Sequence, residues 1–147
     1  MSDRPGSLKV LLVDDEEDFV EVLSQRLETR GITTDTAQDG IDALRKIEGR
    51  SFDAIVLDLR MPGMDGIETL QRMRGLDPDL QIILLTGRAT LKDGIEAMKQ
   101  GAMEFLEKPV DMAKLVDILK EAQDKKLLLT EKRLEDKIKD ILDSKGW

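Results

Sequence analysis

Four acidic residues follow directly on an apolar run near the start of the chain. The run Leu8–Val13 has the composition of a buried strand, and the sequence DDEE, from Asp14 to Glu17, comes next without a basic residue. Carboxylates held close together repel each other, so they need a cation or a proton to coexist. The sequence therefore predicts an acidic site at the end of this strand, with compensating positive charge supplied from elsewhere.

Three more polar residues stand at the ends of apolar runs. They are Asp58 after Ala54–Leu57, Thr86 after Gln81–Leu85, and Lys108, followed by Pro109, after Met103–Leu106. In an open parallel α/β sheet, the working site forms outside the carboxyl ends of the strands. We therefore expect these side chains to meet the acidic run at one edge of a sheet.

A hard divalent cation would resolve the repulsion among carboxylates at such an edge. Mg²⁺ prefers carboxylate oxygens, backbone carbonyls and water, and it usually leaves room for a phosphate oxygen. With Asp58 as a nucleophile, Lys108 as a cation and Thr86 as a hydroxyl donor, the set suits phosphoryl transfer to an acidic side chain. An ionised carboxylate needs no general base, so this chemistry does not require the histidine that the chain lacks.

Each of these residues alone has an ordinary structural alternative. Asp14 and Asp15 could cap a helix, Asp58 could open a turn, and Thr86 could be a plain strand residue. The conjunction favours the site, because several predicted strands each bring a suitable group to the same edge.

Short apolar runs alternate with amphipathic segments along most of the chain. A fifth, weaker run, Ile32–Ala37, alternates with polar residues and suits an edge strand. This alternation predicts an α/β fold with a five-stranded parallel sheet and helices on both faces. Glycines follow four of the amphipathic segments, where a left-handed residue would end a helix; these are Gly31, Gly49, Gly75 and Gly101.

Composition restricts the function further. The chain has 147 residues, a net charge of −8, and neither cysteine nor histidine. The negative charge argues against a sequence-independent grip on DNA, and the missing residues exclude disulfides, thiolate or histidine metal sites and histidine acid–base catalysis. The N-terminus is polar, and no apolar run reaches the roughly 20 residues of a membrane span. We expect a cytoplasmic protein without membrane or direct nucleic-acid contact.

Residues 123–147 continue the helical pattern beyond the alternating region. Leu127, Leu134 and Ile141 recur every seven residues among charges of both signs, which predicts a last helix that continues, or a second helix. The apolar stripe favours a coiled-coil homodimer seam through residues 123–145. The alternative is that the stripe packs back on its own domain.

The segments VLLVDDEEDF, DAIVLDLRMPGMDG, IILLTG and GAMEFLEKPVD together resemble the receiver domain of bacterial two-component response regulators. The resemblance implies a receiver domain over residues 8–122 with the flavodoxin-like strand order 2-1-3-4-5, followed by the helical extension 123–147. It also implies a histidine kinase as a partner, and a downstream protein target or an effector domain as the output. Because only about 25 residues follow the receiver, we expect the output domain to be absent or removed.

The resemblance assigns roles to the acidic residues. Asp58 would accept a phosphoryl group from a histidine kinase or a small acyl phosphate. Asp15 would bind Mg²⁺ directly and Asp14 partly through water, with Asp58 and the backbone carbonyl of Arg60 as further ligands. Arg60 and Arg88 would lie at the rim, where they would influence the lifetime of the phosphoryl group. The protein would thus be a self-modifying phosphoacceptor and not an enzyme acting on a separate substrate.

The resemblance also assigns the remaining site residues. Thr86 and Lys108 would each contact a phosphoryl oxygen, and the Lys108–Pro109 peptide would be cis. Phe105 would be the aromatic switch that turns inward when Thr86 moves. This position holds Phe and not Tyr, so burial or a stacking partner must favour its inward state.

Three other classes of protein are alternatives. A phosphatase of the haloacid dehalogenase type would need an Asp two residues after the nucleophile, where this chain has Arg60. A nucleotide or flavin binder would need a glycine-rich loop after the first strand, where this chain has acids. A receiver used only for assembly would not need the full acid, Thr and Lys set.

Overall fold

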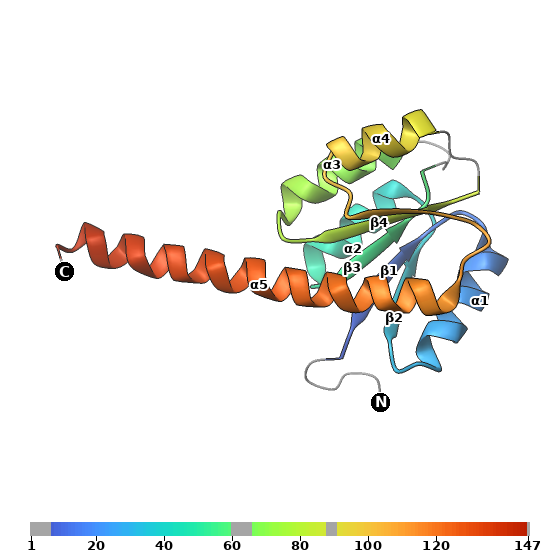
Figure 1. The fold of residues 1–147 in the computed structure, drawn as a ribbon, viewed down its shortest axis with the longest axis horizontal. Helices are drawn as coiled ribbons and strands as arrows, with labels where there is room; N and C mark the ends of the chain where they lie inside the picture. Colours follow the sequence, from blue (N-terminus) through green and yellow to red (C-terminus); the bar gives the residue numbers. More distant parts are fainter. Residues whose placement is uncertain (1–6, 60–65, 88–90, 147) are drawn as a thin grey trace.

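A five-stranded parallel sheet forms the centre of the computed structural model, which describes residues 7–59, 66–87 and 91–146 (Figure 1). The strands are β1 Lys9–Val13, β2 Thr33–Ala37, β3 Ala54–Leu57, β4 Gln81–Thr86 and β5 Glu104–Glu107. Their order is β2-β1-β3-β4-β5. The predicted flavodoxin-like order and the edge position of the second strand are therefore confirmed.

In the described part of the chain, five helices cover the two faces of the sheet. They are α1 Glu17–Glu28, α2 Gly40–Gly49, α3 Gly66–Leu76, α4 Leu91–Lys99 and α5 Met112–Ser144. Side chains of α1 and α5 pack on one face, and those of α2, α3 and α4 pack on the other. None of the helices in the described ranges is long and apolar enough to cross a membrane.

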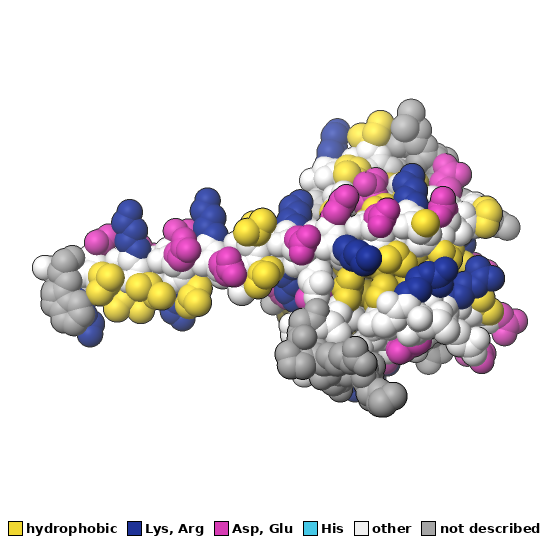
Figure 2. Space-filling model, turned by 60° about the horizontal axis from the view of Figure 1, so that its bottom comes forward, with side chains coloured by type: hydrophobic (Ala, Val, Ile, Leu, Met, Phe, Trp, Pro, Cys, Tyr) yellow, Lys and Arg dark blue, Asp and Glu magenta, His cyan; other side chains and the backbone are white. Residues whose placement is uncertain are grey.

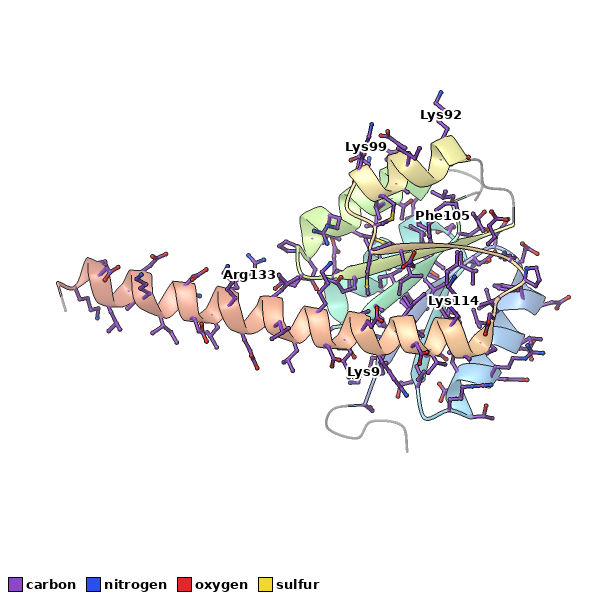
Figure 3. The ribbon with its side chains drawn as sticks, viewed as in Figure 1. Lys9, Lys92, Lys99, Phe105, Lys114 and Arg133 are labelled. Carbon is purple, nitrogen blue, oxygen red and sulfur yellow. The ribbon has the colours of Figure 1, made fainter. Side chains whose placement is uncertain are left out.

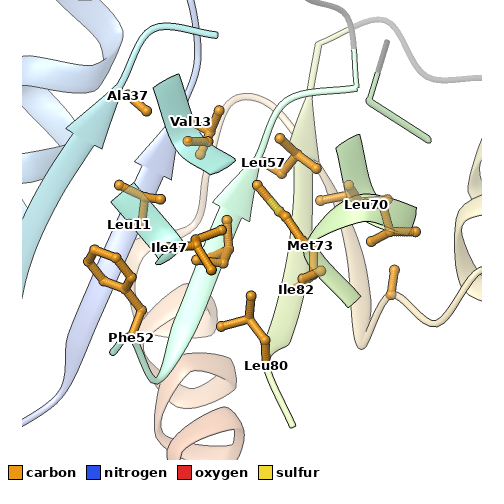
Figure 4. Packing of buried hydrophobic residues seen from close by; sticks show 14 of the residues in the cluster. Leu11, Val13, Ala37, Ile47, Phe52, Leu57, Leu70, Met73, Leu80 and Ile82 are labelled. Atoms are coloured by element: carbon orange, nitrogen blue, oxygen red, sulfur yellow. The ribbon is translucent and has the colours of Figure 1, made fainter. Parts of the chain in front are cut away.

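The central strands β1, β3 and β4 are buried almost throughout on both faces of the sheet, because they are mostly apolar. Leu11 and Val13 of β1 face the cluster that includes Leu70 and Met73 of α3 (Figure 4). Val10 and Leu12 point to the opposite face, toward α1 and α5. Alternate residues of a strand project to opposite faces, so a continuous apolar run suits a central strand of a doubly covered sheet.

Two of the four glycines predicted to end helices have the left-handed conformation. Gly31 and Gly101 have φ values of +81° and +100°, as expected, whereas Gly49 and Gly75 lie within α2 and α3 and lack a positive φ. The prediction is wrong for these two. The chain leaves α2 through the extended residue Arg50, and α3 continues past Gly75 to a turn in which the Leu80 N–H donates to the Asp77 carbonyl.

The last helix is one continuous element of 33 residues. Its first half packs on the sheet through Leu115, Ile118, Leu119 and Ala122, and its second half projects beyond the domain (Figure 1). The sequence left open whether residues 123–144 continue this helix or form another, and the structure shows that they continue it.

Ion pairs hold α5 where it leaves the domain, in a cluster we call the base clamp (Asp77, Asp79, Lys126, Thr130 and Arg133). Arg133 lies where α5 leaves the domain (Figure 3). Its guanidinium donates to both oxygens of Asp79, at 2.6 and 3.1 Å. The Thr130 hydroxyl donates to Asp79 at 3.3 Å. The Lys126 ammonium bonds the Phe52 carbonyl and lies 3.6 Å from Asp77. A paired arginine and carboxylate fix geometry as well as charge, so the clamp sets the direction of the extension.

The apolar stripe lies on a different side of α5 from the base clamp. Leu127 and Leu134 each follow a clamp residue by one position, which is about 100° around an α-helix. Leu127, Leu134, Ile138 and Ile141 are each at least 47% exposed, and Figure 2 shows apolar side chains gathered along one side of the extension. In this structure the stripe therefore does not pack back on its own domain.

The base clamp can be tested through the ionisation of Asp79. Hydrogen bonding to Arg133 holds the pKa of this carboxyl below its ordinary value. We expect Arg133→Gln to raise the pKa of Asp79, measured by NMR titration of the carboxyl carbon, because the main hydrogen-bond donor is lost. Lys132→Gln, the matched control on the neighbouring exposed residue, should leave it unchanged.

The same pKa predicts how stability depends on pH. The pKa of Asp79 is lower in the folded state, so its contribution is present above the unfolded pKa and is lost as pH falls through the folded pKa. Urea unfolding should show a smaller loss of stability on acidification in Arg133→Gln than in wild type. Identical pH dependence in the two proteins would contradict an energetic role for the clamp.

Candidate functional site

Two buried carboxylates meet at the carboxyl edge of the sheet. Val13 of β1 pairs with Leu57 of β3, so the next residues, Asp14 and Asp58, are neighbours at the tips of adjacent strands. The Asp58 N–H donates to the Val13 carbonyl at 3.0 Å, which fixes the two tips together. Asp14 and Asp58 are only 6% and 5% exposed. The expected convergence of these two acids is therefore present.

Lys108 reaches this pair from the loop after β5. Its Nζ lies 2.7 Å from Asp14 Oδ2, 2.8 Å from Glu16 Oε1 and 3.7 Å from Asp58 Oδ2. The same Nζ stands 4.2 Å from the centroid of the Phe19 ring on α1. The sequence predicted Lys108 at this edge, but it did not predict that Glu16 and Phe19 would hold it.

Burial determines how these groups ionise. Burial raises the pKa of Asp14 above its ordinary value, and hydrogen bonds from Lys108 and the Glu16 N–H oppose this only in part. Burial also lowers the pKa of Lys108, but hydrogen bonds to Asp14 and Glu16 outweigh it and raise that pKa overall. Lysine is therefore held as a cation, whereas Asp14 lacks full compensation for its charge.

The described acids could hold a metal ion. One carboxylate oxygen from each of Asp14, Glu16 and Asp58 lies within 4.8 Å of the others. Among the described residues, Lys108 is the cation that ion pairs place against these carboxylates. All the donors are hard oxygens, which suits Mg²⁺. Burial, with a smaller contribution from the charge of Asp58, raises the pKa of Asp14, so a cation bound here would favour the ionised carboxylate.

Asp15 does not join this cluster in the structure. It is exposed, and Glu16 takes the third position among the clustered carboxylates. The predicted role of Asp15 as a direct ligand stays a prediction. Glu16 belongs to the same DDEE run, so the run itself was the signal, but nothing in the run indicated which acid would contact Lys108.

Thr86 and the Lys108–Pro109 peptide lie close to this edge. Thr86 ends β4 and is 1% exposed, and its carbonyl accepts from the Lys108 N–H at 3.0 Å. The Lys108–Pro109 peptide is cis, as expected. Arg60 and Arg88, predicted as a metal ligand and as rim residues, lie outside the described residues.

Phe105 lies on β5 beneath α4 (Figure 3). The ring is half-buried and packs against the cluster beneath α2, α3 and α4. A Cβ at Gly94 of α4 would stand 3.5 Å from the ring, an ordinary contact distance. Gly94 thus allows α4 to approach Phe105 closely. The role of Phe105 as a switch remains a prediction.

Fold and site together define a class: a doubly wound α/β domain with a buried acidic pocket that a lysine closes. The chain belongs to the response regulator receiver domain family, whose sequence profile matches residues 10–120. Receiver domains are the phosphoacceptors of two-component signalling, and they bind Mg²⁺ at their acidic phosphorylation site.

Individual relatives agree with this assignment. The C4-dicarboxylate transport transcriptional regulatory protein DctD of Rhizobium meliloti (strain 1021) is 34% identical over 84% of this chain, which spans 27% of that protein. A receiver domain structure from Clostridium thermocellum superposes with a TM-score of 0.78 at 33% identity, covering 83% of this chain and 98% of that one. The beryllofluoride-activated NtrC4 receiver domain dimer gives 0.76 at 37% identity, covering 80% and 98%.

The raised pKa of the buried Asp14 carboxyl leads to a testable prediction. Because its pKa is raised in the folded state, the folded protein binds more protons there, and this contribution to stability falls as pH rises. We expect Asp14→Asn to raise the free energy of unfolding of the metal-free protein at neutral pH, measured by urea denaturation with EDTA. Asp15→Asn, which neutralises an exposed neighbour, should have little effect. Destabilisation by Asp14→Asn would show that the Lys108 pair outweighs burial.

Proposed function

We propose that this chain is a receiver in which Asp58 accepts a phosphoryl group from a histidine kinase or a small acyl phosphate, with Mg²⁺ as cofactor. The observation that carries the proposal is the buried Asp58 carboxylate, placed beside Asp14 and 3.7 Å from the Lys108 ammonium. Phosphoryl transfer depends chiefly on positioning and charge stabilisation, and these three groups supply both.

Each residue has a defined task in this reaction. A carboxylate oxygen of Asp58 bonds to phosphorus as the bond from phosphorus to the donor nitrogen or acyl oxygen breaks. Asp14, Asp15 and the backbone carbonyl of Arg60 are proposed to hold Mg²⁺, which neutralises charge on the phosphoryl oxygens. Lys108 donates to one phosphoryl oxygen.

Thr86 and Phe105 would carry the signal away from the site. Thr86 donates its hydroxyl to a second phosphoryl oxygen, and Phe105 moves with it. A modification changes an equilibrium only by stabilising one state more than the other. We propose that the face formed by α4, β5 and α5 changes its affinity for a protein target or an effector domain. At the rim, Arg60 and Arg88 would influence the lifetime of the phosphoryl group.

Intact mass spectrometry tests the chemistry. After incubation with acetyl phosphate and Mg²⁺, wild type should gain the mass of one phosphoryl group, and Asp58→Asn should gain none, because the amide is not a nucleophile. Chelating Mg²⁺ should also prevent the gain. Equal modification of wild type and Asp58→Asn would place the acceptor elsewhere and refute the proposal.

We further propose that the extension pairs with a second copy of this chain. The stripe of Leu127, Leu134, Ile138 and Ile141 is exposed, whereas the base clamp uses another side of the helix. Apolar residues at this spacing suit a coiled-coil seam. The related NtrC4 receiver domain is described as a beryllofluoride-activated dimer, which supports self-association of receiver domains in general.

Sedimentation velocity tests the dimer. We expect wild type to sediment as a dimer and the double variant Leu134→Ser, Ile141→Ser as a monomer, because the seam loses two apolar contacts. The control double variant Lys132→Ser, Lys139→Ser changes residues off the stripe and should remain dimeric. A monomeric wild type at high micromolar concentration would rule the seam out.

A further inference from the structure

The contacts of Lys108 point to a role for Glu16 that the proposed function does not include. An ammonium has three N–H donors. In this structure Asp14 and Glu16 accept from it at 2.7 and 2.8 Å. The nearer oxygen of Asp58 is 3.7 Å away, which is beyond normal hydrogen-bond distance. Lys108 is thus held on the Asp14 and Glu16 side of the pocket.

The ring of Phe19 restricts the position of the Lys108 ammonium from another side. Its centroid lies 4.2 Å from Nζ, within the range of a cation–π contact. Phe19 also lines the small space under Asp14 and Asp58, together with Val56 and Leu85. This apolar floor keeps the ammonium in the layer of carboxylates above it.

Glu16 is the partner that Lys108 can release most easily. Its side chain is 63% exposed, whereas that of Asp14 is 6% exposed. An exposed ion pair is weak because water solvates the separated charges well. If Lys108 moves to an oxygen bound to Asp58, the bond to Glu16 is the one to break.

We propose that Glu16 is a positioning residue that holds Lys108 over the Phe19 ring, away from Asp58. When a phosphoryl group is bound to Asp58, Lys108 leaves Glu16 and bonds an oxygen of that group. This inference rests on the proposed function for its second half only. Glu16 opposes the phosphorylated state by stabilising the lysine position of the unmodified one, and its removal favours the occupied state.

The position of Lys108 can be measured without any phosphoryl donor or metal. The ring of Phe19 should shift the Lys108 ε-methylene proton resonances upfield in wild type, and Phe19→Leu should abolish the shift. We expect Glu16→Gln to reduce it, because Lys108 leaves the ring. Glu17→Gln removes the same charge one residue away and should preserve it. Equal shifts in wild type and Glu16→Gln would overturn the proposal.

Binding of beryllofluoride, a phosphoryl mimic, tests the consequence. At saturating Mg²⁺, Glu16→Gln should bind it about two- to fivefold more tightly than wild type, the range of an exposed ion pair. Glu17→Gln should bind as wild type does. Tightening of both variants alike would mean general charge and not positioning, and weaker binding by Glu16→Gln would make Glu16 a metal ligand; either result overturns the proposal.

A different result would refute the proposed phosphoacceptor function itself. If wild type neither binds beryllofluoride nor accepts a phosphoryl group from acetyl phosphate, the proposed function falls. The claim that Glu16 positions Lys108 is then decided by the proton shifts alone.

Discussion

Repulsion between carboxylates at the tips of β1 and β3 is the constraint on which the site depends. Parallel pairing of these strands forces Asp14 and Asp58 side by side, and burial denies them the water that would screen their charge. Lys108 supplies only one positive charge. Such a cluster of acids favours a divalent ion, and that ion would make an anionic donor tolerable beside a carboxylate nucleophile.

Lys108 connects the buried pair Asp14 and Asp58 to the rest of the domain. Its backbone N–H bonds the Thr86 carbonyl, and its ammonium contacts residues that precede and follow the start of α1. Lys108 thus links the loop after β5 to β4 through its backbone and to the end of β1 and the start of α1 through its side chain. A shift of the side chain would change its contacts with Asp14, Glu16 and Phe19 together, which is one way for local chemistry to reach other elements of the domain.

Much of this architecture could be predicted from the chain itself. Central strands such as Ala54–Leu57 are apolar throughout, and each ends at a group with a chemical use, so the parallel sheet and the meeting of Asp14, Asp58 and Lys108 could be predicted from the residues. The full strand order came from the family resemblance. The role of Glu16 could not be predicted, because neighbouring acids in one loop look alike until the backbone determines which one reaches Lys108. The base clamp was also invisible, since Arg133 and Asp79 are 54 residues apart and each is ordinary in its own segment. Gly49 and Gly75 were misjudged because a glycine near a helix end need not be the residue that ends it.

The clamped extension of α5 also has a mechanical consequence. Beyond Arg133, residues 134–144 form about three turns of helix, and at about 1.5 Å per residue they extend roughly 16 Å further. A tilt of about 10° where Arg133 contacts Asp79 would move the far end by roughly 3 Å, close to half a helical turn. The extension therefore acts as a lever: a small change in the orientation of α5 at the domain becomes a larger displacement at its free end.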